Sequence, residues 1–144
     1  MSDKPSIAEN LHAIADKLAD AADTIEGNFR AVAALLEHTP TAFVGINEAS
    51  RIVEWNVHAE KLFGWEKIAV MGKQITEVLI PERLRGAHHQ GMKVFNETGV
   101  GPVLAKPLEM PCLFADGTER KVHLTIYHMP VNGAHFGAFI SPVD

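Results

Sequence analysis

The sequence has 144 residues, of which 47% are hydrophobic and 22% are charged, a composition typical of one globular domain. Its formal net charge of −5 argues against a basic surface for nucleic acid or an anionic membrane. The single cysteine, Cys112, supports neither an intramolecular disulfide nor a site of several thiolates. No stretch approaches the ~20 apolar residues of a membrane span, and the N-terminus has no signal-peptide core, so we expect a cytoplasmic protein.

Residues 6–37 show the strongest periodicity in the sequence. Apolar residues recur at alternating intervals of four and three, the seam of a coiled coil: Ile7, Leu11, Ile14, Leu18, Ala21, Ile25, Val32 and Leu35. Asn28 interrupts this seam, and a buried asparagine can fix the register between paired helices. We therefore predict that residues 1–37 form a helix for homodimerisation, either parallel or antiparallel. The alternative is a helix that folds back on its own domain, with a break at Gly27.

Residues 38–144 form the predicted second domain, and their elements follow in chain order. Two strand-like runs cover residues 42–47 and 51–56 and predict a β-hairpin. Helical segments are expected at residues 58–63, 65–71 and 82–96, the last ending before Gly99. Strand-like runs return at residues 104–114, 121–129 and 135–140, joined by the turn-forming pairs Asp116-Gly117 and Asn132-Gly133. The order is therefore two strands, several short helices and a three-stranded meander.

Short motifs spread over residues 34–143 resemble the PAS sensor family. They are Trp55-Asn56, Ala59-Glu60, Leu62-Phe63-Gly64-Trp65, Met71-Gly72-Lys73, Leu79-Ile80-Pro81-Glu82-Arg83, Thr98-Gly99 and Asp116-Gly117-Thr118-Glu119. The resemblance implies an α+β fold, with a five-stranded antiparallel sheet, short helices on one face and a long N-terminal helix that commonly mediates dimerisation. It also implies a role in signal transduction, with a kinase or regulator as the signalling partner.

Most of these motif residues have expected structural roles. Asn56 is positioned to cap the helix that follows it. Leu62, Phe63 and Trp65 are expected to fill the core, and Gly64 and Gly72 are expected at positive φ. None of these residues is assigned any chemistry.

His88 is the candidate metal ligand, because residues 80–88 are similar to the corresponding segment of haem-binding PAS oxygen sensors. In those sensors the histidine at this position binds the haem iron, and His89 is the alternative if the register shifts by one. Many PAS domains without haem carry a similar run, in which the histidine is a surface or packing residue. No other histidines show metal-binding spacing; His123 and His128 are predicted to face opposite sides of a strand.

The distal side departs from the haem-sensor pattern. The positions that hold a distal arginine or methionine in those sensors match Leu108 and Lys106, so the arginine that stabilises O₂ is missing. Met110 would approach the iron if a bulge near Pro111 shifts the strand pairing. This departure either counts against haem or implies a gas other than O₂, such as CO or NO. The predicted pocket consists of Val44, Ile46, Leu108, Met110, Ile126, Phe136 and Phe139, and the alternative for each residue is plain core without a cofactor.

Other chemistries have less support in the sequence. A flavin–thiol adduct needs a cysteine in the helix after Asn56, and residues 56–60 contain none. The sequence has no phosphate-binding glycine loop and no nucleophile elbow, burial is expected to raise the pKa of Cys112, and no kinase or cyclase domain follows Asp144, so we expect no enzyme activity. The leading function is a gas sensor with haem b on His88 and with Leu108, Met110, Ile126 and Phe136 beside it. The alternative is a ligand-free module for protein interaction and dimerisation.

Overall fold

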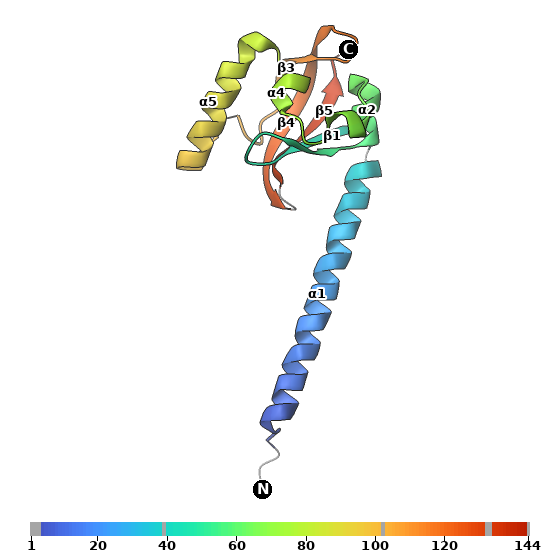
Figure 1. Ribbon diagram of the computed structural model, residues 1–144, viewed down its shortest axis with the longest axis vertical. Coiled ribbons are helices and arrows are strands. Elements are labelled where there is room, and N and C mark those ends of the chain that lie inside the picture. The colour runs from blue at the N-terminus through green and yellow to red at the C-terminus, as the bar shows by residue number, and fades with distance from the viewer. Residues whose placement is uncertain (1–3, 39, 102, 132–133, 144) are drawn as a thin grey trace. The chain divides into compact units, whose positions relative to one another are not determined.

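The computed structural model describes residues 4–38, 40–101, 103–131 and 134–143 (Figure 1). Contacts divide the chain into two units, Met1–Leu35 and Leu36–Asp144. The helices are α1 (Ile7–His38), α2 (Val57–Phe63), α3 (Lys67–Val70), α4 (Ile75–Val78) and α5 (Glu82–Thr98). The strands are β1 (Ala42–Ile46), β2 (Ile52–Trp55), β3 (Leu108–Leu113), β4 (Glu119–Val131) and β5 (Ala134–Pro142). Within the described ranges, no helix has both the length and the apolar character needed to cross a bilayer.

α1 is one continuous helix of 32 residues, which confirms the helix predicted from the heptad pattern. It begins with a capping box, in which the Ser6 hydroxyl accepts the Glu9 N–H and the Glu9 carboxylate accepts the Ser6 N–H, both at 3.1 Å. The helix continues through Gly27, so the break considered at that residue is absent. Self-association of α1 stays a prediction.

The five strands form one antiparallel sheet, as predicted, and their order in the sheet is β2-β1-β5-β4-β3. β1 and β2 make the predicted hairpin, and the Asp116-Gly117 turn joins β3 to β4, with Gly117 at φ 83°. The Asn132-Gly133 turn lies outside the described residues. β3 is an edge strand, which explains how the sheet accommodates Pro111.

The hydrophobic core lies on one face of the sheet, where the helices cover it. Alternate residues of a strand point to the same face, so each strand contributes every second side chain. The buried residues from this face are Ala42, Val44, Ile46, Val122, Leu124, Phe136 and Ile140. Phe63 of α2 joins this core, with its ring centroid 5.5 Å from that of Trp55 and 5.1 Å from that of Phe114.

Trp65 does not belong to the core, so that prediction was wrong. Gly64 ends α2 in the left-handed conformation at φ 87°, as predicted, and the chain then turns toward the surface. Trp65 is consequently 36% exposed, whereas Phe63 is 1% exposed. The contribution of Trp65 to the fold is its backbone carbonyl, which accepts the indole N–H of Trp55 at 3.0 Å.

The third strand begins later than predicted. Residues 103–106 form a turn, and β3 starts only at Leu108. Ala105 adopts φ 58°, which no strand permits, and its N–H donates to the Ile126 carbonyl at 2.7 Å. The β3–β4 register then runs without a shift from Leu108 to Leu113, so the bulge near Pro111 that would bring Met110 toward the iron is absent.

Asn56 joins the first hairpin to α2 through a buried side-chain amide. Its carbonyl oxygen accepts two backbone N–H groups at 2.9 Å, from Ala59 and from Phe43. Its NH₂ group donates to the Thr41 carbonyl at 3.0 Å. The predicted helix cap is confirmed, and the same side chain also fixes the start of β1.

We predict that Asn56→Ala lowers the free energy of unfolding by about 2 to 4 kcal/mol, because it removes a helix cap and leaves buried backbone groups unsatisfied. The matched control is Asn47→Ala, where an exposed amide oxygen accepts the N–H groups of Ala49 and Arg51 at 3.0 Å. That change should cost less than about 1 kcal/mol. Urea unfolding measures both, and equal losses would contradict the role given to Asn56.

Candidate functional site

α5 presents a half-buried apolar stripe to the domain. The stripe contains Leu84, Met92 and Phe95, which recur at the spacing of one helix face, whereas Val94, also half-buried, lies off this face. All of α5 is described, and none of its side chains is fully buried. In Figure 1, α5 and α2 lie at opposite sides of the domain, with α4 between them. α5 is therefore packed more loosely than α2, which buries Ala59 and Phe63 completely.

Phe95 sets the orientation of this stripe. Its ring centroid lies 4.8 Å from that of Phe136 on β5 and 4.9 Å from that of His128 on β4. Phe95 lies two helical turns after His88, on the same face of α5. The face of α5 that carries His88 is therefore directed toward the β4–β5 part of the sheet.

His88 has a buried polar atom without a partner. Among the described residues, its Nδ1 is the one fully buried side-chain nitrogen or oxygen that makes no hydrogen bond. Burial lowers the pKa of His88 below its usual 6.5, and the nearby His89 ring, 5.9 Å away between centroids, lowers this pKa further. His88 is therefore held as a neutral imidazole, the form that donates a lone pair to a metal ion.

The sheet supplies apolar side chains on the side that faces the helices. Leu108 of β3 and Ile126 of β4 are half-buried there, and Phe136 of β5 is buried. Leu108 pairs with Leu124, and Ile126 pairs with Ala138, so the register places all of them on the core face. Leu108, Ile126, Met92 and Phe95 pack against the core but are only partly buried.

Two predicted pocket residues do not fit this arrangement as expected. Phe139 lies on the opposite face of the sheet, where its ring is 5.0 Å from that of Phe43, because it is three residues from Phe136 in the same strand. Met110 shares the core face with Leu108 by register, but it is 37% exposed at the edge strand. Lys106 is exposed in the turn before β3. Val44 and Ile46 lie on the core face as predicted.

The start of α5 is held by contacts that the sequence analysis missed. The Arg83 guanidinium lies 2.6 Å from the Glu119 carboxylate at the beginning of β4. The Arg85 Nε–H donates to the Ile80 carbonyl at 3.1 Å. Both arginines lie in the segment 80–88 that resembles haem-binding PAS sensors, but nothing in the sequence identified Glu119 as a partner. Together they fix the helix turn that leads to His88.

The loop after α5 was also missed. Leu104, in this loop, is half-buried and packs on the core. A Cβ atom placed on Gly101 would lie 2.8 Å from Leu104 and 3.5 Å from Phe95, so the loop lies close against the end of the helix. Gly101 is the sequence signal for this close approach.

His89 points to a different environment from His88. It is exposed and lines an open groove of about 660 Å³ between α5 and the segments that carry Ser50 and Thr76. This groove is lined mainly by polar residues: Glu48, Ala49, Ser50, Gln74, Thr76, His89, Met92, Lys93, Asn96 and Glu97. Of the two adjacent histidines, only His88 therefore has a buried imidazole nitrogen on the apolar face.

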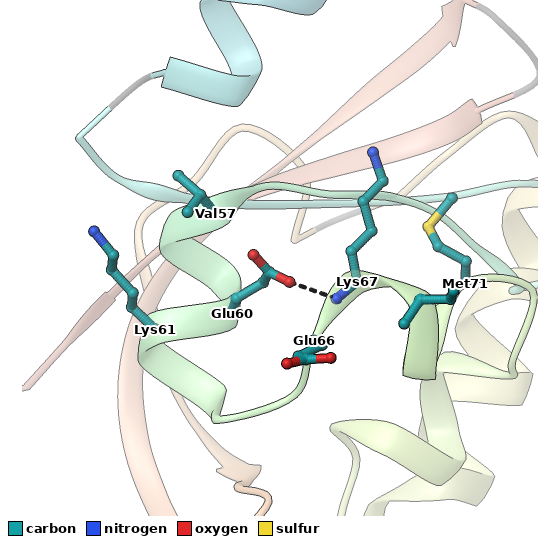
Figure 2. Close-up of a pocket in the computed structure, with 7 residues that line it drawn as sticks. Val57, Glu60, Lys61, Glu66, Lys67 and Met71 are labelled. Carbon is teal, nitrogen blue, oxygen red and sulfur yellow. Dashed lines mark hydrogen bonds between the residues drawn. The ribbon is translucent and has the colours of Figure 1, made fainter.

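A second open groove, of about 760 Å³, lies between α2 and α3 (Figure 2). Its charged rim is held by the Glu60 carboxylate, which accepts the Lys67 N–H at 2.7 Å. Its apolar part consists of Val57, Ile68 and Met71, and Ile68 is 87% exposed. The groove contains no histidine, cysteine or hydroxyl side chain that would act as a ligand or nucleophile.

The remaining candidates for chemistry are inert in the described part of the chain. Burial raises the pKa of Cys112 to about 12, so its thiol is protonated and unreactive, as predicted. Strand pairing places His123 opposite Ser141 and His128 opposite Phe136, on different faces of the sheet. No group of three or more potential metal ligands occurs among the described residues.

The fold and the sequence both assign the chain to a family: residues 30–142 match the model of the PAS fold, and the protein belongs to the PAS family. PAS domains are sensory modules of signal transduction. The observed five-stranded sheet, with helices on one face, confirms the fold that the family resemblance implied.

Three similar proteins show the range of the family. The chain is 32% identical over 112 residues to an uncharacterized protein of Azorhizobium caulinodans, and 33% identical over 103 residues to the oxygen sensor protein DosP of Escherichia coli. These matches cover 77% and 72% of this chain but only 15% and 12% of those proteins. The PAS domain of the Cronobacter turicensis quorum-sensing receptor RpfR, in complex with C12:0, superposes with a TM-score of 0.58 at 13% identity, over 74% of this chain and 97% of that chain.

We predict that His88→Leu stabilises the protein without cofactor by about 1 kcal/mol near neutral pH, because it removes a buried nitrogen that has no partner. The gain should grow as the pH falls. The lowered pKa of folded His88 means that the unfolded chain takes up the proton first, so wild-type stability declines below the usual value of 6.5 and levels off below the folded pKa.

Chemical denaturation at several pH values measures this effect, with the exposed His89→Leu variant as the control. A constant difference between His88→Leu and wild type at all pH values would contradict the neutral, buried state of His88.

Proposed function

We propose that this PAS domain is a gas sensor that binds haem b through His88. The observation that carries the proposal is the buried Nδ1 of His88, which has no partner and lies on the apolar face of α5. An oxygen sensor, DosP, is a relative at 33% identity, which supports haem as the cofactor. The finer assignment is that His88 is the iron ligand and that Leu108, Met110, Ile126 and Phe136 contact the cofactor.

The residues of the site fit this cofactor chemically. A neutral imidazole binds iron through one nitrogen while the other carries the proton, and burial keeps His88 neutral. The half-buried Leu108 and Ile126, with the buried Phe136, provide the apolar surface that a flat macrocycle covers, and they exclude water from it. When bound, haem supplies an iron atom with a coordination position for a diatomic gas.

The distal residues favour CO or NO over O₂. Leu108 has no hydrogen-bond donor, Met110 is a weak acceptor, and Lys106 is exposed before the strand. Bound O₂ is stabilised by a donor near it, whereas CO depends on one much less. The site chemistry therefore supports a sensor in which O₂ is the weaker ligand.

The N-terminal unit supports a role in transmission. Residues 1–37, with the heptad seam of α1, serve as a homodimerisation helix in this proposal, and residues 38–144 serve as the sensor. Signalling then passes to a kinase or regulator rather than to a catalytic site in this chain. The alternative is a module without a cofactor that binds a protein partner.

The first test is the absorption spectrum of the purified protein after addition of haem. Wild type and His89→Ala should show an intense Soret band, and His88→Ala should bind haem at least about tenfold more weakly, with a shifted band. An unchanged band in His88→Ala would rule out this ligand. Failure of wild type to bind haem would end the haem proposal and leave the interaction module.

The second test concerns the distal side. Leu108→Arg introduces a charged donor, so it should raise O₂ affinity by about 10- to 100-fold, since such hydrogen bonds are worth roughly 1.5 to 3 kcal/mol. Leu108→Met, which adds no donor, is the matched control. O₂ titration followed by absorbance measures the affinity, and equal affinities in both variants would place Leu108 away from the gas.

A further inference from the structure

α1 exposes an apolar face along its whole length. The large side chains of the seam have exposed fractions of 54% or more: Ile7 79%, Leu11 62%, Ile14 54%, Leu18 66%, Ile25 68% and Leu35 69%. A contiguous exposed apolar surface of this kind marks an association site. The question is which partner covers it and how many helices meet there.

The apolar face of α1 is wider than a two-stranded seam. In the heptad set by Ile7 and Leu11, Leu11, Leu18, Ile25 and Val32 occupy position a, and Ile7, Ile14, Ala21, Asn28 and Leu35 occupy position d. Position e, directly after d, is alanine in the first half of the helix: Ala8, Ala15 and Ala22, all exposed. A face made of positions a, d and e covers three of every seven residues, which is typical of helix bundles, whereas a two-stranded coil uses only a and d.

The residue types at a and d divide the helix into two parts. In the first part, leucine occupies a, at Leu11 and Leu18, and isoleucine occupies d, at Ile7 and Ile14. Leucine at a with isoleucine at d shifts the preference to higher oligomers such as tetramers. In the second part, β-branched Ile25 and Val32 occupy a, the pattern that favours two strands.

The charges on α1 identify the partner as further copies of this chain. Every acidic residue of the helix lies at an outer position b, c or f: Glu9, Asp16, Asp20, Asp23, Glu26 and Glu37. The only charged residue at a flanking position e or g is Lys17. Identical helices can therefore approach through this face without bringing carboxylates together.

Asn28 selects the direction of the helices. In a parallel assembly in register, the Asn28 amides of neighbouring copies meet and satisfy one another. An antiparallel pair aligned over the seam sets Asn28 against a leucine, such as Leu18, and leaves the amide without a partner. The exposed Asn28 thus favours the parallel arrangement.

We infer that residues 7–22 of α1 form a parallel four-helix bundle from four copies of this chain, while residues 25–35 associate in pairs. The inference rests on the homodimer proposed for α1 and adds that two such dimers join, in the parallel direction, through residues 7–22. It does not depend on haem, because the bundle residues are separate from the pocket residues.

Sedimentation equilibrium of the full chain, up to millimolar concentration, measures the mass. We expect wild type to reach four times the chain mass and Ala15→Glu, at position e, to fall to twice the chain mass. Ala13→Glu, at the outer position c, is the matched control and should remain tetrameric. Circular dichroism should give the same helix content for all three proteins.

An exchange of leucine and isoleucine in the seam provides an independent test. The triple variant Leu11→Ile, Ile14→Leu and Leu18→Ile places isoleucine at a and leucine at d, so it should be a dimer with an unchanged helix content by circular dichroism. A wild-type mass of two chains at every concentration would overturn the four-helix bundle and retain dimerisation. A wild-type mass of one chain would overturn self-association altogether, and loss of the tetramer in Ala13→Glu would overturn the assignment of the face.

Discussion

The buried amide of Asn56 is the interaction on which the order of the domain depends. Through three hydrogen bonds it links the start of β1, the end of β2 and the first turn of α2. Trp55 and Phe63, on either side of this amide in the sequence, are both 1% exposed. A hydrogen-bonded polar group inside the core specifies one arrangement of these segments, because any other would leave it unsatisfied.

The other side of the domain is built differently. α5 is held at its start by Arg83 and Arg85 and along its length by Phe95, and its remaining contacts are half-buried. The side of the domain at the first hairpin is therefore tightly packed, whereas the side at α5 is loosely packed. Such an arrangement suits a sensory domain, because α5 can change position at little cost to the fold.

The sequence predicted most of the elements because their signals are local. The Asn56 cap, the glycines at positive φ and the Asp116-Gly117 turn each follow from a short run of residues. α4 was not predicted because four residues carry no periodicity. Leu104 was assigned to a strand because it is apolar, but its neighbour Ala105 turns the chain through a hydrogen bond to Ile126, which is distant in sequence.

For the site, too, what could be predicted depends on whether the signal is local in the sequence. Phe136 and Phe139 are three residues apart, so strand alternation alone excludes them from a common face, and this rule was available from the sequence. The unpartnered nitrogen of His88 could not be predicted from the sequence, because it depends on how α5 lies against a sheet formed by distant residues. The pairing of Arg83 with Glu119 was missed for the same reason, because the two residues are 36 positions apart in the sequence.

The buried thiol of Cys112 has a practical consequence for any study of this protein. Cys112 lies in β3, the edge strand that also contains Leu108. Burial raises the pKa of its thiol to about 12, so thiol reagents cannot modify it while the strand is in place. Opening of β3 exposes the thiol and restores its ordinary reactivity. The rate of labelling therefore reports how often the sheet opens at this edge, and it does so in the natural sequence without an introduced probe.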